Sequence, residues 1–201
     1  DVSEATLARL AERAVAMARE APEDPYAGLA DPGQIAAGWD LAALDLCDPA
    51  PEPDPAILEE DARRAEAAAM KTAGVRQVEA SAGYGLRRMH LAATNGFSGG
   101  YARTSRSVSA VAFVGEGTGM ERDYAGESRI FQADLPAPDE IGRLAAERAV
   151  ARLNATKPAT GRYPVLFDER IAASLIGHLL GAVNGAAVAR GASWLRDALG
   201  Q

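Results

Sequence analysis

The run from Ile171 to Ala189 carries no formal charge, and glycine recurs in it at every fourth position: Gly177, Gly181 and Gly185. Its length is close to the minimum for crossing a bilayer. Polar residues interrupt it, however, and no belt of Trp and Tyr flanks it. Each glycine costs a helix roughly 1 kcal/mol relative to alanine, so close packing against another element has to offset them. The run therefore predicts a buried helix of a soluble protein, not a membrane span.

Hydrophobic periodicity over the rest of the chain predicts an α+β fold. Helical spacing occurs over 3–20, 55–71 and 138–154, with Ser3 and Asp54 as caps. Alternating patterns predict strands over 75–80, 86–94, 101–114 and 120–131, with turns at 95–100 and 115–119. A short strand at 162–167 precedes Asp168, which can cap the long glycine-striped helix. We expect an antiparallel (mixed) sheet meander flanked by helices, with that buried helix near the C-terminus.

Two segments of the chain differ in their predicted secondary structure. Residues 1–74 read as a helical segment with a Pro/Asp-rich loop at 45–55, and residues 75–201 read as a sheet-and-helix core. Asp1 stands almost at a helix cap, and Gln201 follows helix-like residues without a terminating element. We expect one continuous domain of a larger protein.

Composition limits the partners. The net charge is −7 with no dominant run of like charge, and this balance argues against nucleic acid, which gains affinity from Lys and Arg on phosphates. The single cysteine, Cys47, excludes an internal disulfide and a cysteine-based zinc cluster. A lone thiol suits a reducing cytoplasm.

The predicted hairpin offers a candidate binding surface. A turn at 95–100 would place His90 opposite Ser105 and Arg88 opposite Ser107. One face would then be polar and basic, with Arg88, His90, Arg103, Ser105, Ser107 and Ser109. Such a face could line a cleft for the carboxylate or backbone of a peptide, or it could be an ordinary solvated face. A one-residue slip would reverse the assignment.

Neither histidine has the surroundings that catalysis requires. A nucleophilic pair of Ser105 and His90 lacks a third orienting group and an oxyanion hole. A helix-borne zinc site needs two histidines on one face with a glutamate between them, whereas His178 stands alone and Ala182 lies four residues on. The local sequence favours a hydrogen-bonded core or interface histidine at 178.

Several long blocks, in order, carry a family resemblance: MAREAPEDPYAGLAD, NGFSGGYARTSRSVSA, GEGTGMERDY and ERAVARLNATKPATGRYPVLFDERIAASLIGHLLGAVNGAAVARGASWL. Together they resemble the PmbA/TldE branch of the TldD/PmbA proteins, also called the modulator of DNA gyrase or peptidase U62 family. The resemblance spans essentially the whole chain. Members carry a further N-terminal stretch and a further β-rich C-terminal domain, so it implies a central fragment.

The resemblance implies a two-subunit cytoplasmic zinc protease that acts on unfolded peptides, including peptide antibiotic precursors and an antitoxin. In the TldD branch, an HExxxH helix supplies zinc ligands and the general base. Here the first His of that motif falls on Gly177, its Glu on His178 and its second His on Ala182, so no catalytic residue carries over. The implied role is a non-catalytic subunit without a cofactor, with zinc expected only in a TldD-like partner. The gyrase label gives no reason to assign DNA binding.

Two other interpretations stay open. One is a self-sufficient peptide hydrolase that uses His90 or His178 with ligands outside this fragment. The other is a plain assembly module, and a homodimer of the fragment is compatible with either.

Overall fold

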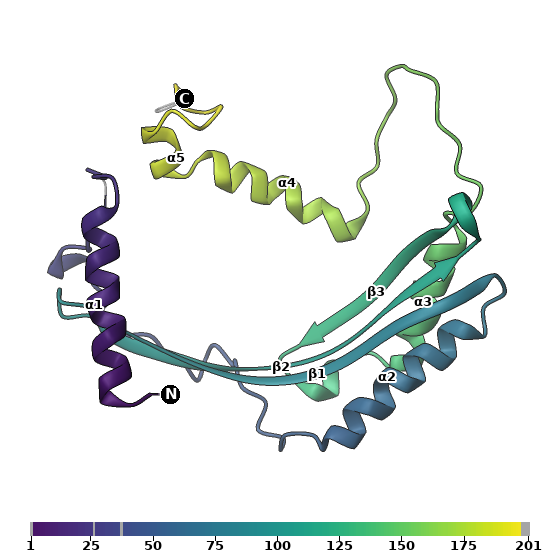
Figure 1. Ribbon diagram of the computed structural model, residues 1–201, viewed down its shortest axis with the longest axis horizontal. Coiled ribbons are helices and arrows are strands. Elements are labelled where there is room, and N and C mark those ends of the chain that lie inside the picture. The colour runs from purple at the N-terminus through teal and green to yellow at the C-terminus, as the bar shows by residue number, and fades with distance from the viewer. Residues whose placement is uncertain (1, 26, 37, 198–201) are drawn as a thin grey trace. The chain divides into compact units, whose positions relative to one another are not determined.

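The computed structural model describes residues 2–25, 27–36 and 38–197. Contacts divide the chain into two compact units, Ala30–Ala159 and Asp1–Leu29 with Thr160–Gln201. The unit Ala30–Ala159 contains a three-stranded antiparallel sheet with two helices on one face (Figure 1). The predicted α+β fold, an antiparallel meander flanked by helices, is confirmed.

The sheet has the order β1–β2–β3, so β1 and β3 form its edges. β1 (Val75–Ala92) and β2 (Ser98–Val114) pair along almost their whole length. β3 (Glu121–Arg129) pairs with β2 only between Arg106 and Val114. The remaining part of β1 and β2 is a two-stranded ribbon that extends beyond the helices (Figure 1). The sequence predicted two strands, 75–80 and 86–94, in the place of β1. β1 is continuous because residues 81–85 remain paired with β2.

The hairpin turn is shorter than predicted. β1 ends at Ala92 and β2 begins at Ser98, so Ser98–Gly100 belong to the strand and not to the turn. The φ of Gly96 is +96°, and Asn95 Oδ1 accepts a hydrogen bond from the Phe97 N–H at 3.2 Å. The Gly96 N–H donates to the Ala93 carbonyl oxygen at 3.1 Å and the Ala93 N–H to the Phe97 carbonyl oxygen at 2.9 Å, so three residues, Thr94 to Gly96, make the turn, with glycine at the position of positive φ. The register is centred on Asn95, which pairs His90 with Gly100 instead of Ser105.

Two helices cover one face of the sheet. α2 (Pro55–Met70) begins at its predicted cap, where Asp54 Oδ1 accepts from the Ala56 N–H at 2.8 Å, and α3 (Pro138–Val150) begins with proline. Eight of the eleven residues in the buried cluster are alanine: Ala65, Ala69, Ala110, Ala112, Ala125, Ala145, Ala146 and Ala149. Small side chains let the two helices approach closely. A Cβ built on Gly142 of α3 would lie 1.9 Å from the Ala65 carbonyl oxygen of α2.

A buried ion pair joins α2 to the sheet. The Arg106 guanidinium donates to the Asp61 carboxylate, and it also donates to the carbonyl oxygens of Gly83 and Ser107 at 3.1 and 3.2 Å. The Arg106 side chain is 4% exposed and the Asp61 side chain 16%. In this way α2 packs on the sheet within the unit Ala30–Ala159.

The Pro/Asp-rich loop is fastened to the edge of β2 where β3 no longer pairs. The Thr104 N–H donates to the Leu46 carbonyl oxygen at 3.0 Å, and the Asp48 N–H donates to Thr104 Oγ1 at 2.8 Å. The Asp48 carboxylate accepts from the Gln132 N–H at 2.7 Å and the Ala50 N–H at 2.8 Å. These backbone donors, Gln132 first, lower the pKa of Asp48 below its usual 3.8.

In the other unit, α1 (Glu4–Glu20) is the predicted N-terminal helix, with Ser3 as its cap. α4 (Glu169–Ala182) begins at the predicted cap Asp168, whose carboxylate accepts from the Arg170 N–H at 3.0 Å. The predicted single helix through residue 189 is wrong, because a second helix, α5 (Gly185–Ala189), starts after a break. Asn184 caps α5 by accepting from the Ala187 N–H at 3.1 Å.

The predicted burial of the glycine-striped helix is not confirmed within the residues that the structure describes. A Cβ on Gly177, Gly181 or Gly185 would meet no atom within 4 Å, and Gly185 lies on α5. Ile176 and Leu180 are each 63% exposed. A helix is buried only where another surface covers it, and among the described residues of α4 that holds for Ala182 alone.

Residues 162–167, predicted as a short strand, form no strand. A lone extended segment needs a partner strand, and the described sheet ends at β1 and β3. Within the described residues, no helix combines the length and the apolar character that a bilayer crossing needs.

Candidate functional site

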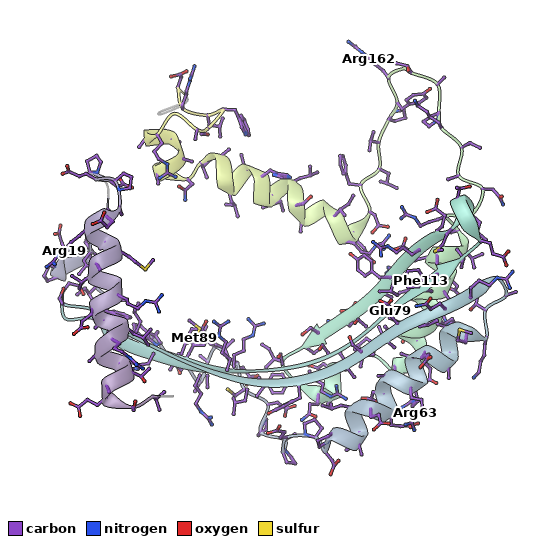
Figure 2. All side chains as sticks on the ribbon, in the orientation of Figure 1. Arg19, Arg63, Glu79, Met89, Phe113 and Arg162 are labelled. Carbon is purple, nitrogen blue, oxygen red and sulfur yellow. The ribbon has the colours of Figure 1, made fainter. Side chains whose placement is uncertain are left out.

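The face of the sheet turned away from α2 and α3 is the candidate site, and we call it the open face. Figure 2 shows Glu79, Met89 and Phe113 on this side, opposite the helices. On β1 it comprises Gln77, Glu79, Ser81, Gly83, Gly85, Arg87, Met89 and Leu91. Their partners on β2 are Phe113, Val111, Ser109, Ser107, Ser105, Arg103, Tyr101 and Gly99.

The register divides the predicted polar surface between two faces. Paired residues share a face, so Arg103, Ser105 and Ser107 lie on the open face. Arg88 and His90, opposite Ala102 and Gly100, point to the other side. The predicted grouping is therefore wrong, because the true register is shifted by an odd number of residues and each shift of one residue exchanges the faces.

Small residues form the middle of the open face. Ser81 pairs with Ser109, and their hydroxyl oxygens are 2.8 Å apart. Gly83 lies opposite Ser107 and Gly85 opposite Ser105. With neither bulky nor charged side chains here, an extended backbone can approach the sheet closely.

An apolar pocket lies at the tip of the ribbon. Its volume is about 320 Å³, and its lining residues are Trp39, Met89, His90, Leu91, Phe97, Gly99, Gly100 and Tyr101. Trp39 stacks on Phe97 with ring centroids 5.6 Å apart. A Cβ on Gly99 would lie 2.4 Å from the Trp39 ring, so only glycine lets the indole rest on the strand.

Two arginines follow this pocket along the open face. Arg87 and Arg103 are paired directly across β1 and β2, one row below the pair of Met89 and Tyr101. Both are exposed, and neither forms an ion pair or a side-chain hydrogen bond with any residue that the structure describes. Like charges placed directly opposite each other destabilise a sheet, so the pair costs stability unless an anion joins it.

A larger cavity of about 730 Å³ lies at the other end of the sheet. It is lined by Glu79, Val111, Phe113, Met120, Glu121, Arg122, Asp123, Tyr124 and Arg152. Arg152 Nη1 donates to Asp123 Oδ2 at 3.1 Å, which holds the end of α3 against β3. The open face thus has a hollow at each end and a smooth middle.

The histidines are placed separately from these features. The ring Nε2 of His90 lies 3.1 Å from Ser98 Oγ, and the predicted contact with Ser105 does not form. His178 is exposed on α4 and has no hydrogen-bond partner in the described part of the chain, so the hydrogen-bonded environment predicted for it is absent there. Across residues 2–25, 27–36 and 38–197, no three His, Cys, Asp or Glu side chains are grouped as a metal site would require.

Sequence reasoning missed Trp39, Phe97 and Arg87. A three-residue turn at 94–96, with Gly96 at the position of positive φ, was the signal that could have found Arg87, because a turn centred on Asn95 sets the register that places Arg87 opposite Arg103. No local pattern brings Trp39 to the hairpin, since the contact joins distant segments.

Comparisons with known proteins agree along the chain. The family model of the PmbA/TldA metallopeptidase central domain matches residues 48–153, and that of the PmbA/TldA metallopeptidase C-terminal domain matches residues 160–201. Metalloprotease PmbA of Escherichia coli O157:H7 is 37% identical over 100% of this chain and 44% of its own length. The metalloprotease PmbA homolog of Haemophilus influenzae is 31% identical with the same coverage of both. The chain therefore spans less than half the length of these curated relatives.

Two crystal structures have the same fold. A protein of Bacteroides thetaiotaomicron described as a modulator of DNA gyrase has a TM-score of 0.82 and 27% identity, over 96% of this chain and 45% of that one. A protein of Thermotoga maritima with a similar description has a TM-score of 0.63, over 81% of this chain and 39% of that one. Its 18% identity shows the fold alone. With the matched domain models and the two PmbA sequences, these findings establish that the chain belongs to the PmbA/TldD metallopeptidase family.

Proposed function

We propose that this chain is part of a zinc-free subunit that pairs with a zinc-bearing, TldD-like subunit in a cytoplasmic protease of unfolded peptides. The observation that carries the proposal is the identity of three residues on α4: Gly177, His178 and Ala182. They stand where the related TldD branch has two histidines and a glutamate.

Ligand chemistry supports this role. Catalytic zinc takes three protein ligands at about 2.0–2.3 Å, and α4 offers one imidazole. The nearest carboxylate on α4 is Glu169, nine residues before His178 and so about 13 Å away along the helix axis. Glycine and alanine side chains at the remaining motif positions bind no metal. A helix with this composition cannot supply the ligands for catalytic zinc by itself.

The open face supplies the second part of the proposal. Its middle of serine and glycine leaves room for an extended peptide, and its two ends are hollowed. We infer that this face helps to enclose the substrate beside the partner's zinc.

Metal analysis tests the missing ligands. The protein purified at neutral pH without chelator is expected to hold less than about 0.1 zinc per chain by mass spectrometry of the metal. Stoichiometric zinc that disappears in a His178→Ala variant would overturn the proposal.

Co-purification tests the partnership and separates the other two interpretations. A tagged protein is expected to carry an HExxxH-bearing subunit with it and to cleave peptides only in that complex. Cleavage by the purified protein alone, abolished by His90→Ala or His178→Ala, would instead indicate a self-sufficient hydrolase. A stable complex without any peptidase subunit would indicate an assembly module.

A further inference from the structure

A pair of arginines without a counter-ion borders an apolar pocket on the open face. Arg87 and Arg103 face each other, and the next row of the same face, Met89 with Tyr101, belongs to the pocket lining. Rows on one face are two residues apart, which is about 7 Å along a strand. A single small ligand can therefore touch the arginines and the pocket together.

Neither arginine forms an ion pair with a described acidic residue, and the carboxylate of the neighbouring loop, Asp45, lines a separate pocket with Tyr101 and Ala102. The nearest acidic residue of β1 on the same face is Glu79, eight residues from Arg87 and so about 27 Å away along the strand. On β3, Glu127 pairs with Val108 and therefore lies on the helix-covered face, where it accepts from Arg129. The ligand that fits two guanidinium groups side by side is a carboxylate, which arginine binds through parallel N–H···O hydrogen bonds.

The pocket fits one apolar side chain. Its volume of about 320 Å³ is roughly twice that of a cavity known to hold a benzene ring, about 150 Å³. Aromatic and aliphatic side chains provide most of its lining, and Gly99 admits the Trp39 ring that forms one wall. A bulky apolar group buried here would be removed from water on several sides.

We propose that the pocket and the arginine pair bind the C-terminal residue of an extended peptide, with its apolar side chain in the pocket and its α-carboxylate on Arg87 and Arg103. Both groups of such a residue are attached to one Cα, which matches two adjoining rows of the open face. This inference rests on the proposed role of the open face in holding peptides, and it adds a preference for the peptide terminus.

The first experiment compares two peptides and needs no variant. An acetylated Gly/Ser hexapeptide ending in leucine is titrated into the purified protein by calorimetry at low salt, as the free acid and as the C-terminal amide. The free acid is expected to bind at least tenfold more tightly, because charge-assisted hydrogen bonds are lost in the amide. Equal affinity of the two peptides would overturn the proposal.

Substitutions then locate the site. Arg87→Gln and Arg103→Gln should each weaken binding of the free acid about tenfold and leave binding of the amide unchanged. Arg88→Gln is the matched control, because Arg88 is the next residue on the same exposed strand and points to the other face. Trp39→Ala should weaken both peptides alike. An equal loss in Arg88→Gln, or no loss in the other two arginine variants, would overturn the assignment.

Three further outcomes define the ligand class and keep this inference separate from the proposed function. If octanoate binds as tightly as the peptide acid, the site recognises apolar carboxylates in general and the peptide assignment fails. If the zinc-bearing subunit co-purifies but the two peptides bind alike, the terminus preference fails and the subunit role stands. If the free acid binds more tightly but no such subunit associates, the terminus preference stands and the subunit role fails.

Discussion

At the scale of single residues, the pair of Arg106 and Asp61 is the most consequential contact. Arg106 is almost fully buried, so removing its partner leaves a charge without compensation in the core. Asp61→Ala is expected to lower the free energy of unfolding by about 3 kcal/mol. Urea denaturation followed by circular dichroism measures the loss.

A matched control lies on the same helix. Glu59 pairs with Arg63 at 2.5 Å, but both side chains are more than half exposed. Glu59→Ala should therefore cost less than about 0.5 kcal/mol. Similar losses in the two variants would show that burial of the Arg106 pair is energetically unimportant.

The lowered pKa of Asp48 predicts that the free energy of unfolding depends on pH. Its pKa is lowered in the folded chain by the Gln132 and Ala50 N–H groups, so its contribution to stability is present above pH 3.8 and is lost as the pH falls through the folded-state value. The stability difference between the wild type and Asp48→Asn should be largest at neutral pH and shrink below about pH 4. Denaturation curves from pH 7 to pH 2.5 test this. Glu52→Gln, in the same loop, is the control, and a difference that grows in acid would contradict the prediction.

At the scale of elements, the contact of α2 with α3 depends on Gly142. Alanine normally stabilises a helix interior by about 1 kcal/mol over glycine. Here the added methyl would meet the Ala65 carbonyl oxygen, and the helices would have to separate. Gly142→Ala is expected to lower the free energy of unfolding by about 1–3 kcal/mol in spite of its better helix propensity.

Gly181→Ala on α4 is the counterpart. No atom lies within 4 Å of its would-be Cβ, so this change should not destabilise the isolated chain. Should it instead weaken association with another subunit, the glycine would have its packing role there. A Gly142→Ala variant as stable as the wild type would contradict the close approach of α2 and α3.

Helix starts were predictable because they depend on local chemistry. Ser3, Asp54 and Asp168 each accept the backbone hydrogen bond expected of a cap. The hairpin register was harder to predict, because NGFSGG has glycines at two places where the turn could form. The position of the turn decides on which face of the sheet every later residue lies. The candidate site was therefore half predicted: Arg103, Ser105 and Ser107 lie on the open face, whereas Arg88 and His90 do not.

At the scale of the whole molecule, the buried core belongs to one unit. All the residues of the main hydrophobic cluster lie between Ala65 and Ala149. Outside Ala30–Ala159, Ala182 and Ser193 are the only buried residues among those described. The exposure of α4 in this chain was not predictable from its apolar sequence, because burial depends on what surface covers a helix and not on the helix alone.

This distribution predicts that residues 30–159 fold independently. Expressed alone, they should unfold cooperatively in urea at the same midpoint as the corresponding transition of the longer chain. Hydrogen exchange should show protected amides in β2 and α3 in both. Unprotected amides throughout the isolated segment would show that the core needs the rest of the protein.

The position of β1 at the margin of the described sheet has a practical consequence. Its outer side presents a row of backbone N–H and C=O groups along the strand, which any extended chain can join. Charged side chains discourage such joining, and β1 has them at Arg76, Glu79, Arg87 and Arg88. Between Ser81 and Leu86 it has none, so an added strand would meet the least charge at this stretch.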